Sequence, residues 1–377
     1  MIYFDQAASS FPKPEGVVQA VSEAITDYAA NPGRGGHRLA KKAASIIQET
    51  RVELSGFFGV GYSENVWFYP NATAALNQAL KGFSLTAGDH VITTSFEHNS
   101  VRRPLEYLKR TKKIRVSYIH PEVDWAKEIT DRTKLIVATH GSNLTGRIVP
   151  IEKIAQFAKQ FNIPFLVDAS QTAGILPIHM KEMGIDMLAF SGHKGLLGPQ
   201  GTGALLVRSG IKLEPYIHGG TGSHSEDIDQ PEQLPERFES GTLNTPGIAG
   251  LLAGLKEIKK IRMASIYEHE SELTSYCVRG LKEIDGVRVF DEDSGVERLA
   301  VISFRIDNVD VQETAIVLDQ HYDIAVRAGL HCTPLAHESI GTMDGGTVRV
   351  SFGPYNTKEE IDQFLRAVEE IKYGLGS

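Results

Sequence analysis

Two stretches of the sequence decide the fold: PFLVDASQT, residues 164–172, and MLAFSGHKGLLGPQGTG, residues 187–203. Each contains a short run of apolar, β-favouring residues that passes directly into small and polar residues. Runs of this kind, separated by helical patterns, are typical of buried strands in a parallel sheet. The two stretches therefore predict strands that carry Asp168 and Lys194 at or just beyond their carboxyl ends.

The same alternation extends outward on both sides, from about Pro14 to Arg208. Helical patterns cover residues 16–30, 39–59, 74–83, 102–110 and 151–161, and apolar runs lie at 66–69, 90–96, 115–119, 135–140, 164–170, 187–192 and 204–208. We expect an α/β fold with a mostly parallel central sheet and helices on both faces, forming a large domain over residues 15–245.

After Pro246 the pattern changes. Longer helical patterns at 248–261, 266–284, 311–322 and 358–373 alternate with strand patterns at 287–290, 299–306 and 347–352. This order predicts a smaller α+β domain with an antiparallel sheet over residues 246–377, completed by the amino-terminal residues 1–14. The polar stretch 219–236 is long for a connection without regular structure, so it is either functional or mobile.

Composition and charge exclude several classes of protein. The chain has 377 residues, 41% of them hydrophobic, and a formal net charge of −8 without a basic cluster, which argues against nucleic acid as a partner. It has neither a signal-like amino terminus nor an apolar run of about 20 residues, so we expect a cytoplasmic protein without a membrane span. Two cysteines exclude a disulfide framework and a Cys-rich metal site, and no metal is expected. Cys277 lies in an amphipathic helical pattern, which indicates core packing.

Lys194 and Asp168 together carry the strongest chemical signal. A lysine at the end of a buried strand can be partly desolvated, which lowers the pKa of its amine and makes it a nucleophile toward carbonyl groups. A lone loop lysine is more often a solvated surface charge, and a lone Asp168 would equally serve as a helix cap. Carboxyl ends of parallel strands bind ligands, however, and pyridoxal phosphate (PLP) needs both an amine and an acidic partner for its ring nitrogen. The pair predicts a PLP site.

Four other residues follow predicted strands. Thr73, in PNATAALN, begins a helix whose free N–H groups can hold the cofactor phosphate. His98, in SFEHNS, can stack on the cofactor ring and exchange protons with a substrate. Asn143 and Gln171 can hydrogen-bond the phenolic oxygen of the cofactor. Taken singly, each of the four is explained as well by a helix cap, a structural histidine or a loop hydrogen bond.

In this order, the motifs resemble the PLP-dependent enzymes of the class V aminotransferase group (fold type I), and within it the cysteine desulfurases and selenocysteine lyases, closest to the group II desulfurases. The resemblance runs through nearly the whole chain: DQAASSFPKP, HRLA, NATAALN, EHNS, DASQ, SGHK, ESGTLNTP, RAGLHC and RVSFGPYNTKEEID. It implies that Lys194 forms the Schiff base with the cofactor, that Asp168 pairs with the ring nitrogen and that His98 stacks on the ring. The remaining implied cofactor contacts are to the phenolic oxygen from Asn143 and Gln171, and to the phosphate from Ala72 (where Thr is usual), Thr73, Ser191 and His193. Thr242 resembles the residue that reaches the phosphate site of the partner subunit, which implies a homodimer.

The segment RAGLHC, residues 327–332, resembles the R-x-G-x-x-C segment whose cysteine becomes a persulfide. Persulfide chemistry needs a thiolate, and cationic Arg327 and His331 would lower the pKa of Cys332. The alternative is a Cys332 that is only a small buried hydrophobe. Arg349 resembles the clamp on the substrate carboxylate, which a guanidinium can bind with two hydrogen bonds. The resemblance adds Arg327 and His37 to the substrate site.

The sequence thus predicts a cysteine desulfurase that converts L-cysteine to L-alanine and passes sulfur through Cys332 to an acceptor protein, as in iron–sulfur cluster assembly. Two alternatives stay open. One is a related lyase, acting on C–S or C–Se bonds and taking L-selenocysteine, or a class V aminotransferase or epimerase, in which Cys332 is incidental; the other is a noncatalytic partner in a sulfur-transfer assembly. Departures from the group II pattern at EHNSVRRPL and TGSHSED leave the substrate and the acceptor open. We expect residues 332–347 to be mobile, because a persulfide must reach its acceptor.

Overall fold

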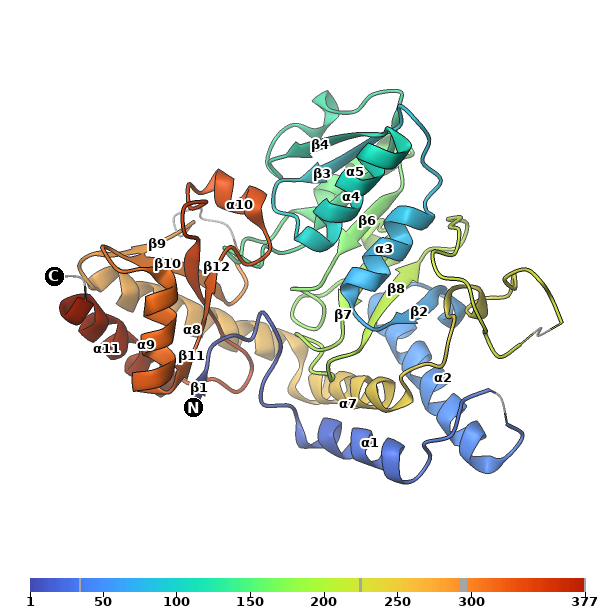
Figure 1. The fold of residues 1–377 in the computed structure, drawn as a ribbon, viewed down its shortest axis with the longest axis horizontal. Coiled ribbons are helices and arrows are strands. Elements are labelled where there is room, and N and C mark those ends of the chain that lie inside the picture. Colours follow the sequence, from blue (N-terminus) through green and yellow to red (C-terminus); the bar gives the residue numbers. More distant parts are fainter. Residues whose placement is uncertain (34, 224–225, 292–296, 376–377) are drawn as a thin grey trace.

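A seven-stranded sheet forms the centre of the larger part of the molecule (Figure 1), in a computed structural model that describes residues 1–33, 35–223, 226–291 and 297–375. The strand order is β2-β8-β7-β6-β5-β3-β4. The strands are β2 (Val66–Tyr69), β3 (His90–Thr94), β4 (Arg115–Ile119), β5 (Thr133–Thr139), β6 (Phe165–Asp168), β7 (Met187–Ser191) and β8 (Gly203–Val207). β8 is antiparallel to both its neighbours, and every other pair is parallel. The carboxyl ends of the six strands other than β8 therefore lie at one edge of the sheet.

Helices cover both faces of this sheet because successive side chains of a strand point to opposite faces. Val66 and Phe68 of β2 belong to a hydrophobic cluster with α2 (Arg38–Phe58), α5 (Ile151–Gln160), α6 (Met180–Met183) and α7 (Thr245–Ile261). Trp67, between them, belongs to a second cluster with α3 (Ala72–Gly82) and α4 (Asn99–Lys112). α1 (Glu15–Thr26) packs on the outside of α7. The predicted α/β fold with a mostly parallel sheet is confirmed.

The smaller part has its own antiparallel sheet, of order β12-β13-β10-β9. Its elements are β9 (Val287–Val289), β10 (Val301–Ile306), β12 (Arg327–Gly329), β13 (Thr347–Ser351), α8 (Met263–Glu283), α9 (Val311–Tyr322), α10 (Pro334–Ser339) and α11 (Lys358–Leu375). The amino terminus joins it, since β1 (Ile2–Tyr3) pairs in parallel with β11 (Ile324–Ala325) and Phe4 is buried in its core. No helix of the described ranges has the length and apolar character needed to cross a membrane.

The two hydrophobic cores meet along α8. Ile266, near the start of this helix, belongs to the core of the large sheet, whereas Leu273, Cys277 and Leu281 belong to the core of the small one. α7 packs on the large sheet with α1 and α2. The domain boundary predicted at residue 245 stays a prediction. In the structure, the change from one hydrophobic core to the other occurs within α8, the helix after α7, which begins at residue 245.

The predicted helices and strands are present, with ends shifted by a few residues. The short elements β1, β11, β12, α6 and α10 were not predicted, because two to six residues hold too little periodicity. Residues 219–223 and 226–235 contain no helix or strand, as expected, and residues 224–225 of that predicted stretch lie outside the described part of the chain. Residues 332–347 are more anchored than predicted, since they include α10 and bury His337 and Thr342 completely.

Replacing Cys277 by serine tests its role in the core of the small domain. Cys277 is 0% exposed, and burial raises the pKa of its thiol, so it has no reactive thiolate. A serine hydroxyl there would lack a partner, and we expect Cys277→Ser to lower the free energy of unfolding by about 1–3 kcal/mol in urea denaturation. Half-buried Cys332 is the matched control, and Cys332→Ser should change the free energy of unfolding by less than about 0.5 kcal/mol. Equal effects of the two substitutions would contradict this assignment.

Candidate active site

Polar side chains that follow five different strands line one cavity of about 230 Å³ at the carboxyl edge of the sheet. Because β2, β3, β5, β6 and β7 point the same way, residues from distant parts of the sequence meet there. They are Ala72 and Thr73 after β2, His98 after β3, Asn143 after β5, Asp168 and Gln171 at the end of β6, and Ser191, His193 and Lys194 at the end of β7, joined by Arg327 and Arg349 from the small domain.

Lys194 presents an amine prepared for carbonyl chemistry. Burial lowers the pKa of Lys194 to about 8; Asp168 opposes this shift, and Arg349 and Arg327 reinforce it. The Nζ atom forms no hydrogen bond with another residue of the described part of the chain. A substantial fraction of this amine is therefore uncharged near neutral pH and free to attack an aldehyde.

Asp168 offers one carboxylate oxygen to a ligand. Its Oδ1 accepts hydrogen bonds from the backbone N–H of Ser170 at 2.9 Å and from the Ser170 hydroxyl at 2.5 Å. Its Oδ2 has no partner among the described residues, although the residue is only 4% exposed. This free oxygen at the cavity wall suits the protonated ring nitrogen of PLP, the role that the sequence predicts for it.

The start of α3 offers an anion site. Asn71 caps the helix, because its side chain accepts from the backbone N–H of Ala74 at 2.9 Å, which leaves Thr73 free of that task. The Thr73 hydroxyl lies 2.7 Å from Ser100 Oγ, and Ser100 in turn bonds Nδ1 of His98 at 2.9 Å. The helix N-terminus and this chain of side chains join the phosphate end of the cavity to His98.

Two buried polar atoms of the cavity wall support the fit of a phosphorylated cofactor. Ser191 Oγ and His193 Nδ1 are inaccessible to solvent and lack hydrogen-bond partners within the described ranges. Buried polar atoms are rarely left unsatisfied, so these positions favour a polar ligand. With Thr73 they form a donor set that matches a phosphate group. The residues present therefore fit PLP, with Lys194 and Asp168 at its two reactive ends.

His98 is a neutral imidazole in this site. Burial, together with the positive charges of Lys194 and Arg327, outweighs Asp168 and lowers the pKa of His98 to about 4. The ring is fixed because Nδ1 accepts from the backbone N–H of Ser100 at 3.1 Å. This leaves Nε2 as the nitrogen that carries the proton. A fixed, uncharged ring suits stacking on a cofactor.

Asn143 and Gln171 line the cavity, but their amide nitrogens also hold neighbouring backbone. Asn143 Nδ2 donates to the carbonyl of His331 at 2.8 Å, and Gln171 Nε2 donates to the carbonyl of Ala7 at 3.1 Å. Each amide nitrogen has two hydrogens, so a second bond to the phenolic oxygen of PLP is available to both. That contact stays a prediction.

Arg349 is buried, only 1% exposed, yet lines the cavity. Its Nη2 lies 2.6 Å from Asp5 Oδ1, and its Nη1 donates to the carbonyl of Asn143 at 3.0 Å. Its Nε has no hydrogen-bond partner among the described residues. The guanidinium is thus held in place and keeps a donor at Nε, and its role as a carboxylate clamp stays a prediction. Asp5 was not predicted, because 344 residues separate the pair.

Cys332 lies beside the cavity without lining it. The carbonyl of Cys332 accepts from the backbone N–H of Asn99 at 2.8 Å, which attaches the cysteine to the loop of His98. Its Sγ lies 3.9 Å from Arg327 Nη2, and Arg327 does line the cavity. Both His331 (φ 46°) and Cys332 (φ 61°) have left-handed backbone, a strained conformation for such residues.

His331 does not supply the positive charge that was predicted beside Cys332. Burial and the nearby Arg349 lower the pKa of His331 to about 2, so the ring is neutral. Its Nε2 lies 3.1 Å from the carbonyl oxygen of Thr347. The prediction that His331 is a cationic neighbour of Cys332 is therefore wrong. Arg327 remains as the cationic residue of the predicted pair.

Two predicted site residues, Thr242 and His37, lie outside the cofactor cavity. Thr242 is exposed and lines a different hollow, with Gly241 and Arg51. His37 is an exposed cap of α2, where its Nδ1 accepts from the backbone N–H of Ala40 at 3.4 Å. Neither residue reaches the cavity of its own chain. Sequence reasoning also missed Ser100 and Ser170, although each lies inside a quoted motif, because their hydroxyls contact other side chains rather than the cavity alone.

The pKa of Lys194 can be tested by combining cofactor-free protein with PLP. Only the uncharged amine attacks the aldehyde, so we expect the rate constant to rise with pH through about 8, and not through the ordinary lysine value near 10.5. Asp168→Asn removes a charge that raises the pKa of Lys194, so its inflection should move lower still. The measurement is stopped-flow absorbance of the lysine-bound cofactor, with a free lysine derivative as reference for the titrations of PLP itself. An inflection near 10.5 in the wild type would refute the desolvated amine.

Comparison with known proteins agrees with this geometry. The family model described as aminotransferase class-V matches residues 2–364. A probable cysteine desulfurase of Pyrococcus abyssi is 34% identical over 397 aligned positions, which span 100% of this chain and 96% of the relative. Two solved structures are similar: apo cysteine desulfurase from Thermococcus onnurineus NA1 (TM-score 0.92, 34% identity, 99% and 95% of the two chains covered) and the cysteine desulfurase CsdA from Escherichia coli (TM-score 0.90, 26% identity, 99% and 95% covered). The chain belongs to the class-V aminotransferase family and, within it, to the PLP-dependent cysteine desulfurases.

Proposed function

We propose that this enzyme acts on L-cysteine, releases L-alanine and retains the substrate sulfur on Cys332 as a persulfide. The observation that carries the proposal is the position of Cys332: a half-buried thiol, 3.9 Å from the cavity-lining Arg327, on a backbone bonded to the loop of His98. The thiol thus lies beside the cavity and in contact with one of its wall residues.

Each cavity residue has a role in this reaction. PLP, when bound, supplies an aldehyde and an electron-poor ring that makes Cα of an amino acid acidic. Asp168 holds the ring nitrogen protonated, and Arg349 binds the substrate carboxylate. The amine of Lys194 would take a proton from Cα of the substrate and return it later. Neutral His98 holds the ring from one face and can donate from Nε2.

The sulfur step balances without an external oxidant. The Cys332 thiolate attacks the substrate sulfur, an S–S bond forms, and the C–S bond of the substrate breaks. The bonding electrons pass to the substrate carbon, which takes up a proton and becomes the methyl group of alanine. The products are L-alanine and Cys332–S–SH, and a second thiol can then take the outer sulfur.

A related C–S or C–Se lyase, with L-selenocysteine as a substrate, is the second candidate. The observation that favours it is that Cys332 does not line the cavity. Elimination of sulfur or selenium needs no protein thiol. A class V aminotransferase reaction does not need a protein thiol either. Both alternatives therefore predict that replacing Cys332 leaves the turnover rate unchanged.

We further infer a homodimer in which Thr242 reaches the phosphate site of the other subunit. The support is that Thr242 is exposed and away from the cavity of its own chain, near a segment with exposed Ile217 and Ile228. The same proposal includes a sulfur-acceptor protein, for example one that serves iron–sulfur cluster assembly. It also includes a location in the reducing cytoplasm, where a reactive thiol stays free.

Cys332→Ala tests the proposed function. We expect alanine formation from L-cysteine, with a reductant present, to fall on the order of 100-fold or more, because the nucleophile is lost. The absorbance of the lysine-bound cofactor should stay unchanged, since Cys332 does not line the cavity. Lys194→Ala gives the background rate. Full alanine formation by Cys332→Ala would favour the lyase instead, and parallel assays with L-selenocysteine and L-cysteine sulfinate would then identify its substrate.

Asp5→Asn tests the substrate clamp. The substitution leaves the buried charge of Arg349 without its anionic partner, which should lower stability by about 2–3 kcal/mol. A bound carboxylate restores that compensation, so saturating L-alanine should raise the melting temperature of Asp5→Asn more than that of the wild type. Arg349→Met should lose the response to L-alanine. Equal responses in wild type and Asp5→Asn would show that Arg349 does not receive the carboxylate.

A further inference from the structure

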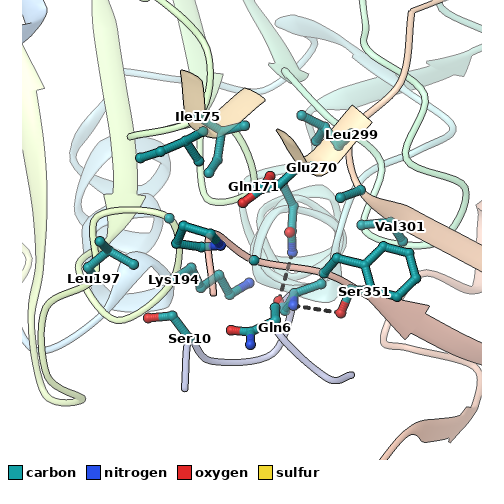
Figure 2. Close-up of a pocket in the computed structure, with 17 residues that line it drawn as sticks. Gln6, Ser10, Gln171, Ile175, Lys194, Leu197, Glu270, Leu299, Val301 and Ser351 are labelled. Carbon is teal, nitrogen blue, oxygen red and sulfur yellow. Dashed lines mark hydrogen bonds between the residues drawn. The ribbon is translucent and has the colours of Figure 1, made fainter. Parts of the chain in front are cut away.

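A second, smaller cavity of about 50 Å³ lies against Lys194 (Figure 2). Ala7, Gln171 and Lys194 line both this cavity and the cofactor cavity, so the lysine side chain borders both. The polar side chains around the smaller one are Gln6, Ser10, Gln171, Lys194, Glu270 and Ser351. None of the reaction steps above uses this cavity or Glu270.

Glu270 is the exceptional residue in this cavity wall. It lies on α8 and is only 4% exposed, yet its carboxyl forms no hydrogen bond or ion pair with another described residue. Thr274 bonds the backbone carbonyl of Glu270 and not its carboxyl. A buried charged carboxylate without a partner is strongly unfavourable, and burial accordingly raises the pKa of Glu270 to about 8.

Water is the partner that the cavity can supply. A volume of about 50 Å³ has room for about three water molecules, and the amide and hydroxyl groups of the wall provide the several hydrogen bonds that buried water needs. Lys194 and Glu270 are the two titratable side chains among the described residues that line it. A short chain of water molecules between them is the simplest way to satisfy both groups.

We propose that Glu270 and water in this cavity form a proton-exchange path to Nζ of Lys194, separate from the cofactor side. In one direction, a proton passes from protonated Nζ of Lys194 to water, while that water passes one of its own protons to the Glu270 carboxylate. In the other, the carboxylic acid returns the proton by the reverse steps. One proton moves, and no other reagent is consumed.

The energetics of the two groups suit this exchange. The pKa values of Lys194 and Glu270 both lie at about 8, so moving a proton between them costs little free energy. The cofactor side offers no comparable acceptor, since Asp168 is committed to the ring nitrogen and His98 is hard to protonate, with a pKa of about 4. The path itself is independent of the substrate, and its effect on turnover rests on the proposed function.

Glu270→Gln is the decisive variant, because it keeps the shape of the side chain and removes the acid. In the PLP-loaded enzyme, a pH jump across the titration of the lysine-bound cofactor should relax about tenfold more slowly in Glu270→Gln than in wild type. Glu270→Asp should recover part of the rate, and Glu283→Gln, an exposed glutamate of the same helix, should match wild type. Unchanged relaxation in Glu270→Gln would overturn the proposal, whether or not L-cysteine proves to be the substrate.

A stability series shows separately whether Glu270 is a neutral buried acid. The folded protein keeps this carboxyl protonated up to about pH 8, whereas the unfolded chain ionises it near its ordinary pKa of 4.5. Wild type should therefore lose stability relative to Glu270→Gln as the pH rises from about 4.5 to 8, with no further loss above that. A difference in melting temperature that does not widen over this range would show that Glu270 ionises freely, and the proposal would fail.

Discussion

The low pKa of the Lys194 amine is the condition on which the chemistry of this enzyme depends, and the sheet creates it. β7 places the lysine at the edge where six strands end, and because β8 is antiparallel to both of its neighbours, β2 ends at the same edge. Burial there removes water from the amine, and the cations of the small domain add to the effect. Asp168 opposes the shift, so the pKa settles at about 8. An amine more strongly paired would be a poorer nucleophile.

The amino-terminal segment holds the two domains in register at this lysine. Asp5 bonds Arg349. The carbonyl of Ala7 accepts a hydrogen bond from Gln171 Nε2, and its N–H donates to Ser351 Oγ. Farther along, Lys13 Nζ donates to the carbonyl of His193 at 2.9 Å. One short segment thus contacts both the carboxylate clamp and the residue next to the reactive lysine. This segment therefore helps to fix the position of Arg349 relative to Lys194.

The sequence predicts the residues at strand ends well and their partners poorly. Lys194 and Asp168 were found because an apolar run stops just before each, which is a local signal. The pairing of Asp5 with Arg349 depends on packing across 344 residues, and no local pattern reports it. Adjacency in the sequence can also suggest an interaction that the structure lacks. His331 precedes Cys332, but its ring is neutral and hydrogen-bonds Thr347.

Because His331 is neutral, the reactivity proposed for Cys332 needs another explanation than a pair of cations. Of the predicted pair, Arg327 at 3.9 Å is the cationic neighbour that remains, so the position of the thiol has to be explained as well as its charge environment. The left-handed backbone at Cys332 is unfavourable by itself, and hydrogen bonds from Asn99 and Asn143 to the adjacent carbonyls hold it in place. Asn99 begins α4 next to His98, and Asn143 lies in the loop after β5. Two hydrogen bonds from the cofactor domain therefore orient the cysteine, although it follows β12, a strand of the small sheet, so the placement of the thiol depends on how the two parts of the molecule are aligned.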